Sequence, residues 1–117
     1  MKAGFAALLC LSALPLYAAP PEVVAAKTSG NGDARVFSVT LAHPDTGWEH
    51  YADGWRVEAE DGTVLGVREL LHPHETEQPF TRSLSGVAIP AGTRRVYIRA
   101  RCLTDGWNEA RTPLDLE

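Results

Sequence analysis

Cysteine is scarce in this chain of 117 residues, which contains two, Cys10 and Cys102. Cys10 lies in an apolar N-terminal run, so an exported form cut after that run keeps Cys102 alone. One cysteine cannot close an internal disulfide. The exported domain of about 100 residues must therefore depend on its hydrophobic core, which at this size buries roughly two thirds of the unfolded surface.

An excess of basic residues is also lacking. The chain has 11 Lys and Arg against 15 Asp and Glu, a formal charge of −4. This balance argues against nucleic acid or anionic lipid as a partner. No second apolar run long enough to span a bilayer follows the first, so we expect no stable membrane insertion.

The motifs of common catalytic sites are missing. No glycine-rich phosphate loop is present, and Ser83 and Ser85 lack the glycines of a nucleophile elbow. The acidic residues at 45, 49 and 53 lack the spacing and central glycine of a calcium-binding helix-loop-helix. We therefore expect that the protein is not an enzyme.

The N-terminus has the pattern of an export signal. Met1-Lys2 supplies one positive charge, an uncharged run follows to Leu14, and Ala18 and Ala19 are small residues suited to a signal peptidase. Residues 1–18 are thus predicted to be a cleaved signal peptide, and the protein is predicted to be periplasmic or secreted. A lipid anchor at Cys10 is disfavoured because Leu9, rather than a small residue, precedes it. Cleavage leaves 10 basic and 15 acidic residues, a formal charge of −5.

Beyond the signal, the sequence predicts strands. Residues 19–33 contain Pro20-Pro21 and a Ser-Gly-Asn-Gly-Asp run, which indicates a flexible arm or an irregular first strand. In residues 36–41, Phe37, Val39 and Leu41 share one face. Residues 55–71 are predicted to be a hairpin, with Trp55 in the core and a type I′ turn at Asp61-Gly62.

The second half of the chain repeats this pattern. Strands are expected at 83–89, 94–102 and 110–116, and Cys102 is expected to be buried because it is in phase with Val96, Ile98 and Ala100. Arginines at 94, 95, 99 and 101 are expected to form a cross-strand charge ladder with acidic residues at 58, 60 and 69. No segment has a sustained 3.6-residue apolar period. Residues 34–117 are therefore predicted to be an all-β domain, a small antiparallel two-sheet sandwich.

Two resemblances accompany this pattern. The run from Val87 through Ile89-Pro90 and Gly92-Thr93, followed by alternation to Ala100, resembles the late strands of fibronectin type III and immunoglobulin-like domains. This resemblance implies the same sandwich fold and carries no function.

A longer resemblance covers most of the mature chain. Residues 47–53 (GWEHYAD), 72–74 (HPH) and 77–84 (EQPFTRSL) are similar to an uncharacterised family of small exported bacterial proteins. The resemblance implies export and brings no activity. The family pattern continues after the last long strand with an acidic residue and a His-Gly-aromatic step. Here Gly106-Trp107 retains the Gly-aromatic part, and the histidine is absent.

The four histidines all lie between residues 43 and 74. Pro73 favours an extended backbone at His72, and residues two apart in an extended segment point the same way, so His72 and His74 suit one copper or zinc ion with a third ligand. The alternative is a structural loop whose histidines bond to carbonyls or carboxylates, and the sequence favours it. The candidate metal ligands are His72, His74, His50, His43, Glu75 and Glu77.

A second set of residues is expected to shape the loops or to bind a ligand. Aromatic faces near residue 50 suit a ligand groove, and Arg82 suits a clamp on the loop or an anion contact. These residues are Trp48, Tyr51, Asp53, Gln78, Phe80 and Arg82. We therefore expect a monomeric, non-catalytic exported module that recognises an unidentified protein or small ligand through its end loops. The alternative is a copper- or zinc-binding protein centred on His72 and His74; no cofactor is otherwise indicated.

Overall fold

The structure, a computed structural model, describes residues 19–31 and 33–116. The predicted signal peptide lies outside these residues, and so does Cys10, the position at which a lipid anchor is disfavoured. In the described part of the chain the elements are all strands. They are β1 Glu22–Ser29, β2 Arg35–Ala42, β3 Ala52–Glu58, β4 Val64–Glu69, β5 Phe80–Val87, β6 Arg95–Cys102, β7 Gly106–Trp107 and β8 Thr112–Asp115.

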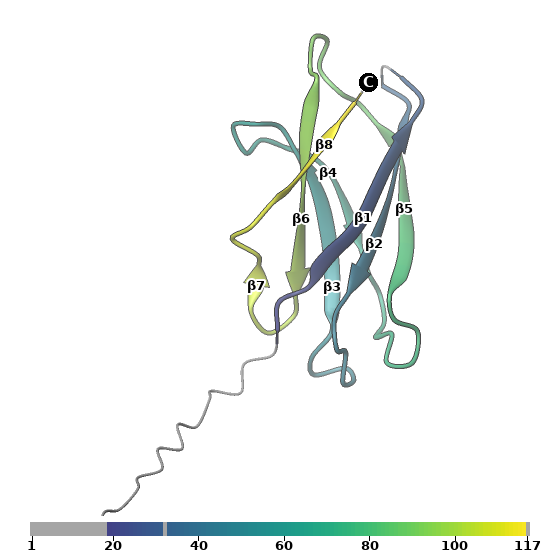
Figure 1. The fold of residues 1–117 in the computed structure, drawn as a ribbon, viewed down its shortest axis with the longest axis vertical. Coiled ribbons are helices and arrows are strands. Elements are labelled where there is room, and N and C mark those ends of the chain that lie inside the picture. Colours follow the sequence, from purple (N-terminus) through teal and green to yellow (C-terminus); the bar gives the residue numbers. More distant parts are fainter. Residues whose placement is uncertain (1–18, 32, 117) are drawn as a thin grey trace, which may run out of the picture.

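The strands form two antiparallel sheets that face each other (Figure 1). One sheet has the order β1-β2-β5. The other has the order β4-β3-β6-β7, and β8 also pairs with β6. The predicted all-β two-sheet sandwich is confirmed. β1 pairs with β2 along most of its length, with an irregularity between Val23 and Ala25.

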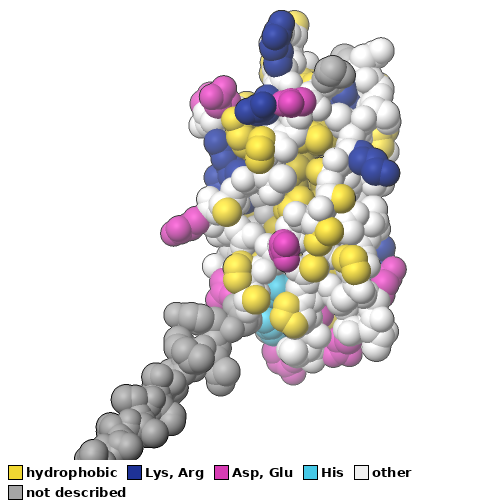
Figure 2. Space-filling model, viewed as in Figure 1, with side chains coloured by type: hydrophobic (Ala, Val, Ile, Leu, Met, Phe, Trp, Pro, Cys, Tyr) yellow, Lys and Arg dark blue, Asp and Glu magenta, His cyan; other side chains and the backbone are white. Residues whose placement is uncertain are grey.

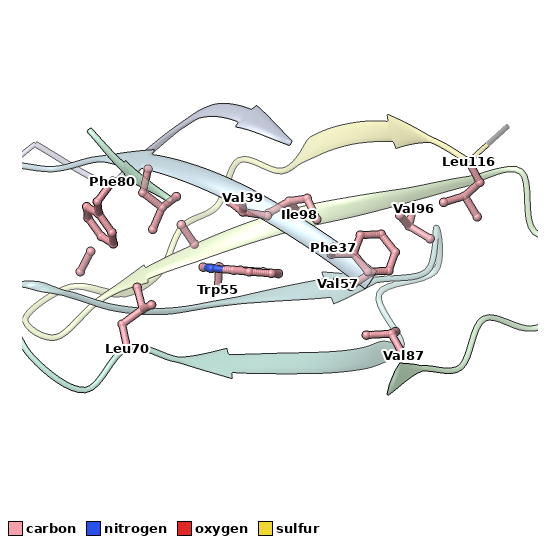
Figure 3. Close-up of a cluster of buried hydrophobic side chains, with 13 residues drawn as sticks. Phe37, Val39, Trp55, Val57, Leu70, Phe80, Val87, Val96, Ile98 and Leu116 are labelled. Carbon is pink, nitrogen blue, oxygen red and sulfur yellow. The ribbon is translucent and has the colours of Figure 1, made fainter. Parts of the chain in front are cut away.

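The hydrophobic core lies between the sheets, and alternation along the strands places it there. Phe37 and Val39 of β2 face Trp55 of β3 and Ile98 of β6, all with at most 1% of their surface exposed (Figure 3). Burying each such side chain contributes about 1.5–3 kcal/mol relative to exposure. The predicted core positions of Trp55 and of the odd-numbered residues of β2 are confirmed.

The predicted hairpin is present, but its turn differs. β3 and β4 pair from Gly54↔Glu69 to Glu58↔Val64. Gly62 has a positive φ of 93° and Asp61 does not, so the predicted type I′ turn is wrong. The Ala59 N–H donates instead to the Thr63 carbonyl at 2.8 Å, and the Asp61 carboxylate accepts the Thr63 N–H at 2.9 Å. This longer loop needs only one residue with positive φ.

The outer face of the larger sheet carries a charge network. Glu58 of β3 is fully buried beneath three arginines, Arg56, Arg99 and Arg111, whose nitrogens lie 2.6–3.2 Å from its carboxylate. Burial alone raises the pKa of Glu58, but hydrogen bonds from Arg99, Arg56 and Arg111 outweigh it and lower the pKa to about 2. Part of the expected cross-strand ladder therefore surrounds a single buried acid.

Candidate metal site

The topology brings all four histidines to one end of the sandwich. β2 ends there and β3 begins there, and the same holds for β4 and β5, because the strands run antiparallel. The loops 43–51 and 70–79 therefore lie at the lower end in Figure 1, together with the end of β6. We call this the histidine end. Figure 2 shows histidine side chains there, with acidic side chains beneath them.

Three potential metal ligands meet at the histidine end: His43, His50 and Cys102. One ligand atom from each residue lies within 4.8 Å of the ligand atoms of the other two. Among the described residues, these three form a group that is close enough to hold one metal ion. His43 has 3% of its surface exposed and Cys102 has none, and the ring centroids of the two histidines are 4.8 Å apart. Imidazole nitrogens and a thiolate are the ligand types that copper and zinc prefer.

Both imidazoles present a buried nitrogen without a partner. The Nε2 atoms of His43 and His50 are shielded from solvent, and no hydrogen-bond partner lies near either among the described residues. A buried polar atom left unpaired costs about 1–3 kcal/mol, and such atoms call for an explanation. Coordination of one ion by both nitrogens would remove both penalties.

Asp45 determines which nitrogen of His43 is free. The carboxylate Oδ1 accepts a hydrogen bond from His43 Nδ1 at 2.5 Å, and both side chains are fully buried. Because a carboxylate accepts, Nδ1 carries the hydrogen and the Nε2 lone pair of the neutral ring is left available. Histidines that bind metals are commonly oriented by a carboxylate in this way.

Asp45 also joins the two loops of the histidine end. Its Oδ1 accepts the backbone N–H of Ala52 at 2.9 Å, and its Oδ2 accepts the N–H of His74 at 2.7 Å. Gln78 adds a second link, since its Oε1 accepts the His43 N–H at 2.9 Å and its Nε2 donates to the His74 carbonyl at 2.8 Å. The position of His43 is therefore held from both loops.

Local backbone bonds shape the loop that carries His50. The Thr46 N–H donates to the His50 carbonyl at 3.0 Å, and the His50 N–H donates to the Gly47 carbonyl at 3.1 Å. Gly47 has φ of 139°, which side-chain-bearing residues rarely adopt. The Leu103 N–H donates to the Tyr51 carbonyl at 2.9 Å, which ties the residue after Cys102 to this loop.

The two histidines singled out in the sequence lie close together in a different setting. The rings of His72 and His74 are 4.7 Å apart, and His72 is exposed. His74 is 5% exposed, and its ring stacks on that of Phe80 with the centroids 3.9 Å apart. Its Nε2 atom accepts a hydrogen bond from Arg82 Nη2 at 2.9 Å. The pKa of His74 is lowered, mainly because the ring is buried and further because of the charges of Arg82 and His72. A metal site centred on this pair stays a prediction.

The acidic candidates lie outside the cluster of three. Glu75 and Glu77 are exposed, and Glu77 lies 3.5 Å from Arg82. Asp53 pairs with Arg101 at 3.2 Å on the sheet face.

The aromatic candidates of the loop are also in contact. Trp48 is 66% exposed, and its ring meets that of Tyr51 edge-on at 5.8 Å. Both residues belong to the loop that carries His50, and Tyr51 is half-buried. Sequence reasoning assigned Cys102 to the core and missed its place beside the two histidines; the only signal is its position at the last residue of β6.

Comparisons with known proteins give one relative in sequence and one likeness in fold. No family model matches it. It is 46% identical over 89 residues to a protein of Halomicrobium mukohataei described as "Putative lipoprotein", which covers 76% of this chain and 43% of that protein. The chain thus spans less than half the length of the curated relative that it matches.

A solved structure resembles the fold. It is the crystal structure of a hypothetical protein from Pyrococcus horikoshii OT3, with a TM-score of 0.53 and 16% identity, covering 86% of this chain and 89% of that one. At this identity the likeness concerns the fold alone. Within residues 19–31 and 33–116, no helix is long and apolar enough to cross a membrane.

Proposed function

We propose that this protein is an exported metal-binding module in which His43, His50 and Cys102 hold one copper or zinc ion. The observation that carries the proposal is the pair of buried, unpartnered Nε2 atoms beside a buried thiol. The proposed role is binding rather than catalysis. Export rests on the N-terminal signal pattern and on the relative described as a lipoprotein.

The donor set suits these two metals. Two imidazoles and one thiolate are the equatorial ligands of blue-copper sites, and three protein ligands with an open fourth position are typical of reactive zinc sites. Cys102 would bind as the thiolate, and its proton would leave on metal binding. The ligand atoms of a tetrahedral ion with bonds of about 2.0–2.3 Å lie roughly 3.3–3.8 Å apart. The observed spread of 4.8 Å needs side-chain shifts of about 1 Å to reach that range.

Two of the three ligands are held near these positions before any ion binds. His43 is oriented by Asp45, Cys102 ends a strand in the middle of the larger sheet, and β3 pairs Ala52 with Cys102. Ligands held by rigid elements lose little conformational entropy on binding, so the affinity for the ion increases.

Metal titration of matched variants tests the proposal. The protein, first treated with a chelator, is titrated with Cu²⁺ and Zn²⁺ by calorimetry, beside His50→Ala and the control His72→Ala. We expect one ion per chain, a loss of affinity of more than tenfold in His50→Ala, and little change in His72→Ala. Co²⁺ as a spectroscopic probe should give a thiolate-to-metal charge-transfer band that Cys102→Ser removes.

The same experiment separates the two histidine pairs. Loss of binding in His72→Ala, with His50→Ala unaffected, would move the site to the loop at 70–79. Equal and weak heats from all three proteins would reject a metal site altogether.

A second candidate function is recognition of a partner by the end loops. The observation that favours it is Trp48, a large apolar side chain that projects beside Tyr51 at the histidine end. Tryptophan and tyrosine are enriched at the centres of interfaces. Loss of co-purification of a specific partner from the native host in Trp48→Ala, with metal binding intact, would support this role.

A further inference from the structure

A small pocket lies between the edge strands of the two sheets. Arg68 lies on β4, Arg82 lies on β5, and the loop between these strands supplies the rest of the lining. Its volume is about 100 Å³. The pocket is lined by Arg68, Leu70, Leu71, His72, His74 and Arg82. It therefore contains two guanidinium groups and two imidazoles, and no carboxylate is part of its lining.

The hydrogen-bond roles of His74 follow from its contact with Arg82. A guanidinium group only donates, so Nε2 of His74 must accept the hydrogen bond from Arg82 Nη2 at 2.9 Å. The ring is then neutral and carries its hydrogen on Nδ1. This Nδ1–H is buried and finds no acceptor among the described residues.

Arg68 supplies a second buried N–H donor without an acceptor. Its Nη1 donates to the Glu69 carbonyl at 2.9 Å, but its Nε–H is shielded from solvent and has no acceptor within the described chain. The side chains of Arg68 and His74 both line this pocket, and each has a buried N–H group without a hydrogen-bond acceptor. An acceptor with several lone pairs in the pocket would satisfy these donors once side-chain rotation turned them toward it.

The positive charges of Arg68 and Arg82 favour an anion as the acceptor. The carboxylate recorded near either arginine is that of Glu77, which lies 3.5 Å from Arg82 and is more than half exposed, so water weakens its attraction. A volume of about 100 Å³ leaves room for a group of the size of a carboxylate or phosphate. Guanidinium groups match the geometry of such oxyanions.

We propose that this pocket, formed by Arg68, His74 and Arg82, binds a small oxyanion of the phosphate or carboxylate class. This inference goes beyond the metal site and does not depend on it, since it uses none of the three proposed metal ligands. The two sites are joined through Asp45, which orients His43 and accepts the backbone N–H of His74, and through Gln78, which bonds to the backbone of both histidines.

Anion titration followed by nuclear magnetic resonance tests the proposal. Phosphate, sulfate and acetate are added separately to the ¹⁵N-labelled, chelator-treated protein, while the Arg68 Nε–H and His74 ring resonances are observed. Chloride at equal ionic strength is the reference. We expect saturable shifts with one oxyanion per chain, and the ranking of phosphate against acetate identifies the favoured class. Shifts that chloride reproduces in full would show only charge screening and would overturn the proposal.

Variants give the second arm of the test. Arg68→Gln should weaken oxyanion binding at least fivefold, whereas the control Arg95→Gln, an exposed arginine paired with Asp115, should not change it. His50→Ala should leave oxyanion binding intact, which separates this site from the metal site. Should Arg68→Gln fail to fold, Arg82→Lys, which keeps the charge and loses the planar fork, should give the same weakening. Wild-type affinity in the folded variant would refute the pocket.

Discussion

The buried carboxylate of Glu58 offers the sharpest test of the energetics of this fold. Glu58 has no exposed surface and accepts hydrogen bonds from Arg56 at 2.6 Å, Arg99 at 2.7 Å and Arg111 at 3.2 Å. These arginines come from three strands or their flanks, so the carboxylate joins β3, β6 and the segment before β8. Replacing Glu58 with Gln removes the negative charge and leaves the three cations facing one another.

The pKa of Glu58 sets the size of the effect. The folded-state pKa of about 2 lies roughly 2.5 units below the ordinary value of 4.5. Each unit is worth about 1.4 kcal/mol, so the ionised form contributes about 3 kcal/mol to the free energy of unfolding. Breaking a buried ion pair by removing one partner costs a similar amount, about 3–5 kcal/mol. We expect Glu58→Gln to lower the melting temperature by roughly 10–20 °C at pH 7.

The pH dependence of the effect has a definite sign. Because folding lowers the pKa of Glu58, its contribution is complete above pH 4.5 and is lost as the pH falls through about 2. Urea unfolding of the wild type and of Glu58→Gln at pH 7, 5, 4 and 3 measures this. The difference between the two proteins should be about 3 kcal/mol at pH 7 and should shrink toward pH 3.

A matched control is available two residues along the chain. Glu60 is exposed, and Glu60→Gln should change the free energy of unfolding by less than about 0.5 kcal/mol at every pH. The reasoning would be refuted if Glu58→Gln cost less than about 1 kcal/mol at pH 7, or if its cost were the same at pH 3 as at pH 7.

Two further predictions concern Asp45 and Gly30. Asp45→Asn should lower the metal affinity measured by calorimetry 10–100-fold, because an amide cannot accept hydrogen bonds at both positions of the carboxylate and His43 loses its orientation. The control is Asp53→Asn on the sheet face, which should bind metal with wild-type affinity. Gly30→Ala should destabilise the fold by about 1–3 kcal/mol in urea unfolding, because φ is 87° and the added Cβ would lie 2.8 Å from the Ala34 carbonyl oxygen. An unchanged unfolding midpoint in Gly30→Ala would contradict this account.

Strand positions and buried faces were readable from the sequence. Side chains alternate across a strand with a period of two, so the apolar residues of 36–41 and of 95–102 specify both the strand and its inner face. The same rule places Trp55 and Cys102 inside, and the structure agrees. The turn at Asp61-Gly62 was less readable, because the side chain of Asp61 stabilises a longer loop that dipeptide preferences do not reveal.

The candidate site was readable only in part. The sequence drew attention to the histidines and to residues such as Gln78 and Arg82, which contact His43 and His74 in the structure. It directed the metal hypothesis to His72 and His74 because they lie two residues apart in a segment expected to be extended. The cluster of three brings Cys102 beside two histidines that lie more than fifty positions earlier in the chain, and Asp45, which orients His43, has no motif of its own.

The sequence by itself therefore determined the class of fold, the inner faces of the strands and the concentration of histidines between residues 43 and 74. Local periodicity and composition suffice for these features because each depends on neighbours within a few residues. Only the tertiary structure decided which histidines meet Cys102, which acid lies beneath three arginines and which donors lack acceptors. Those features depend on strand pairing and on contacts between loops far apart in the chain, such as Ala52 beside Cys102 and Asp45 beside His74.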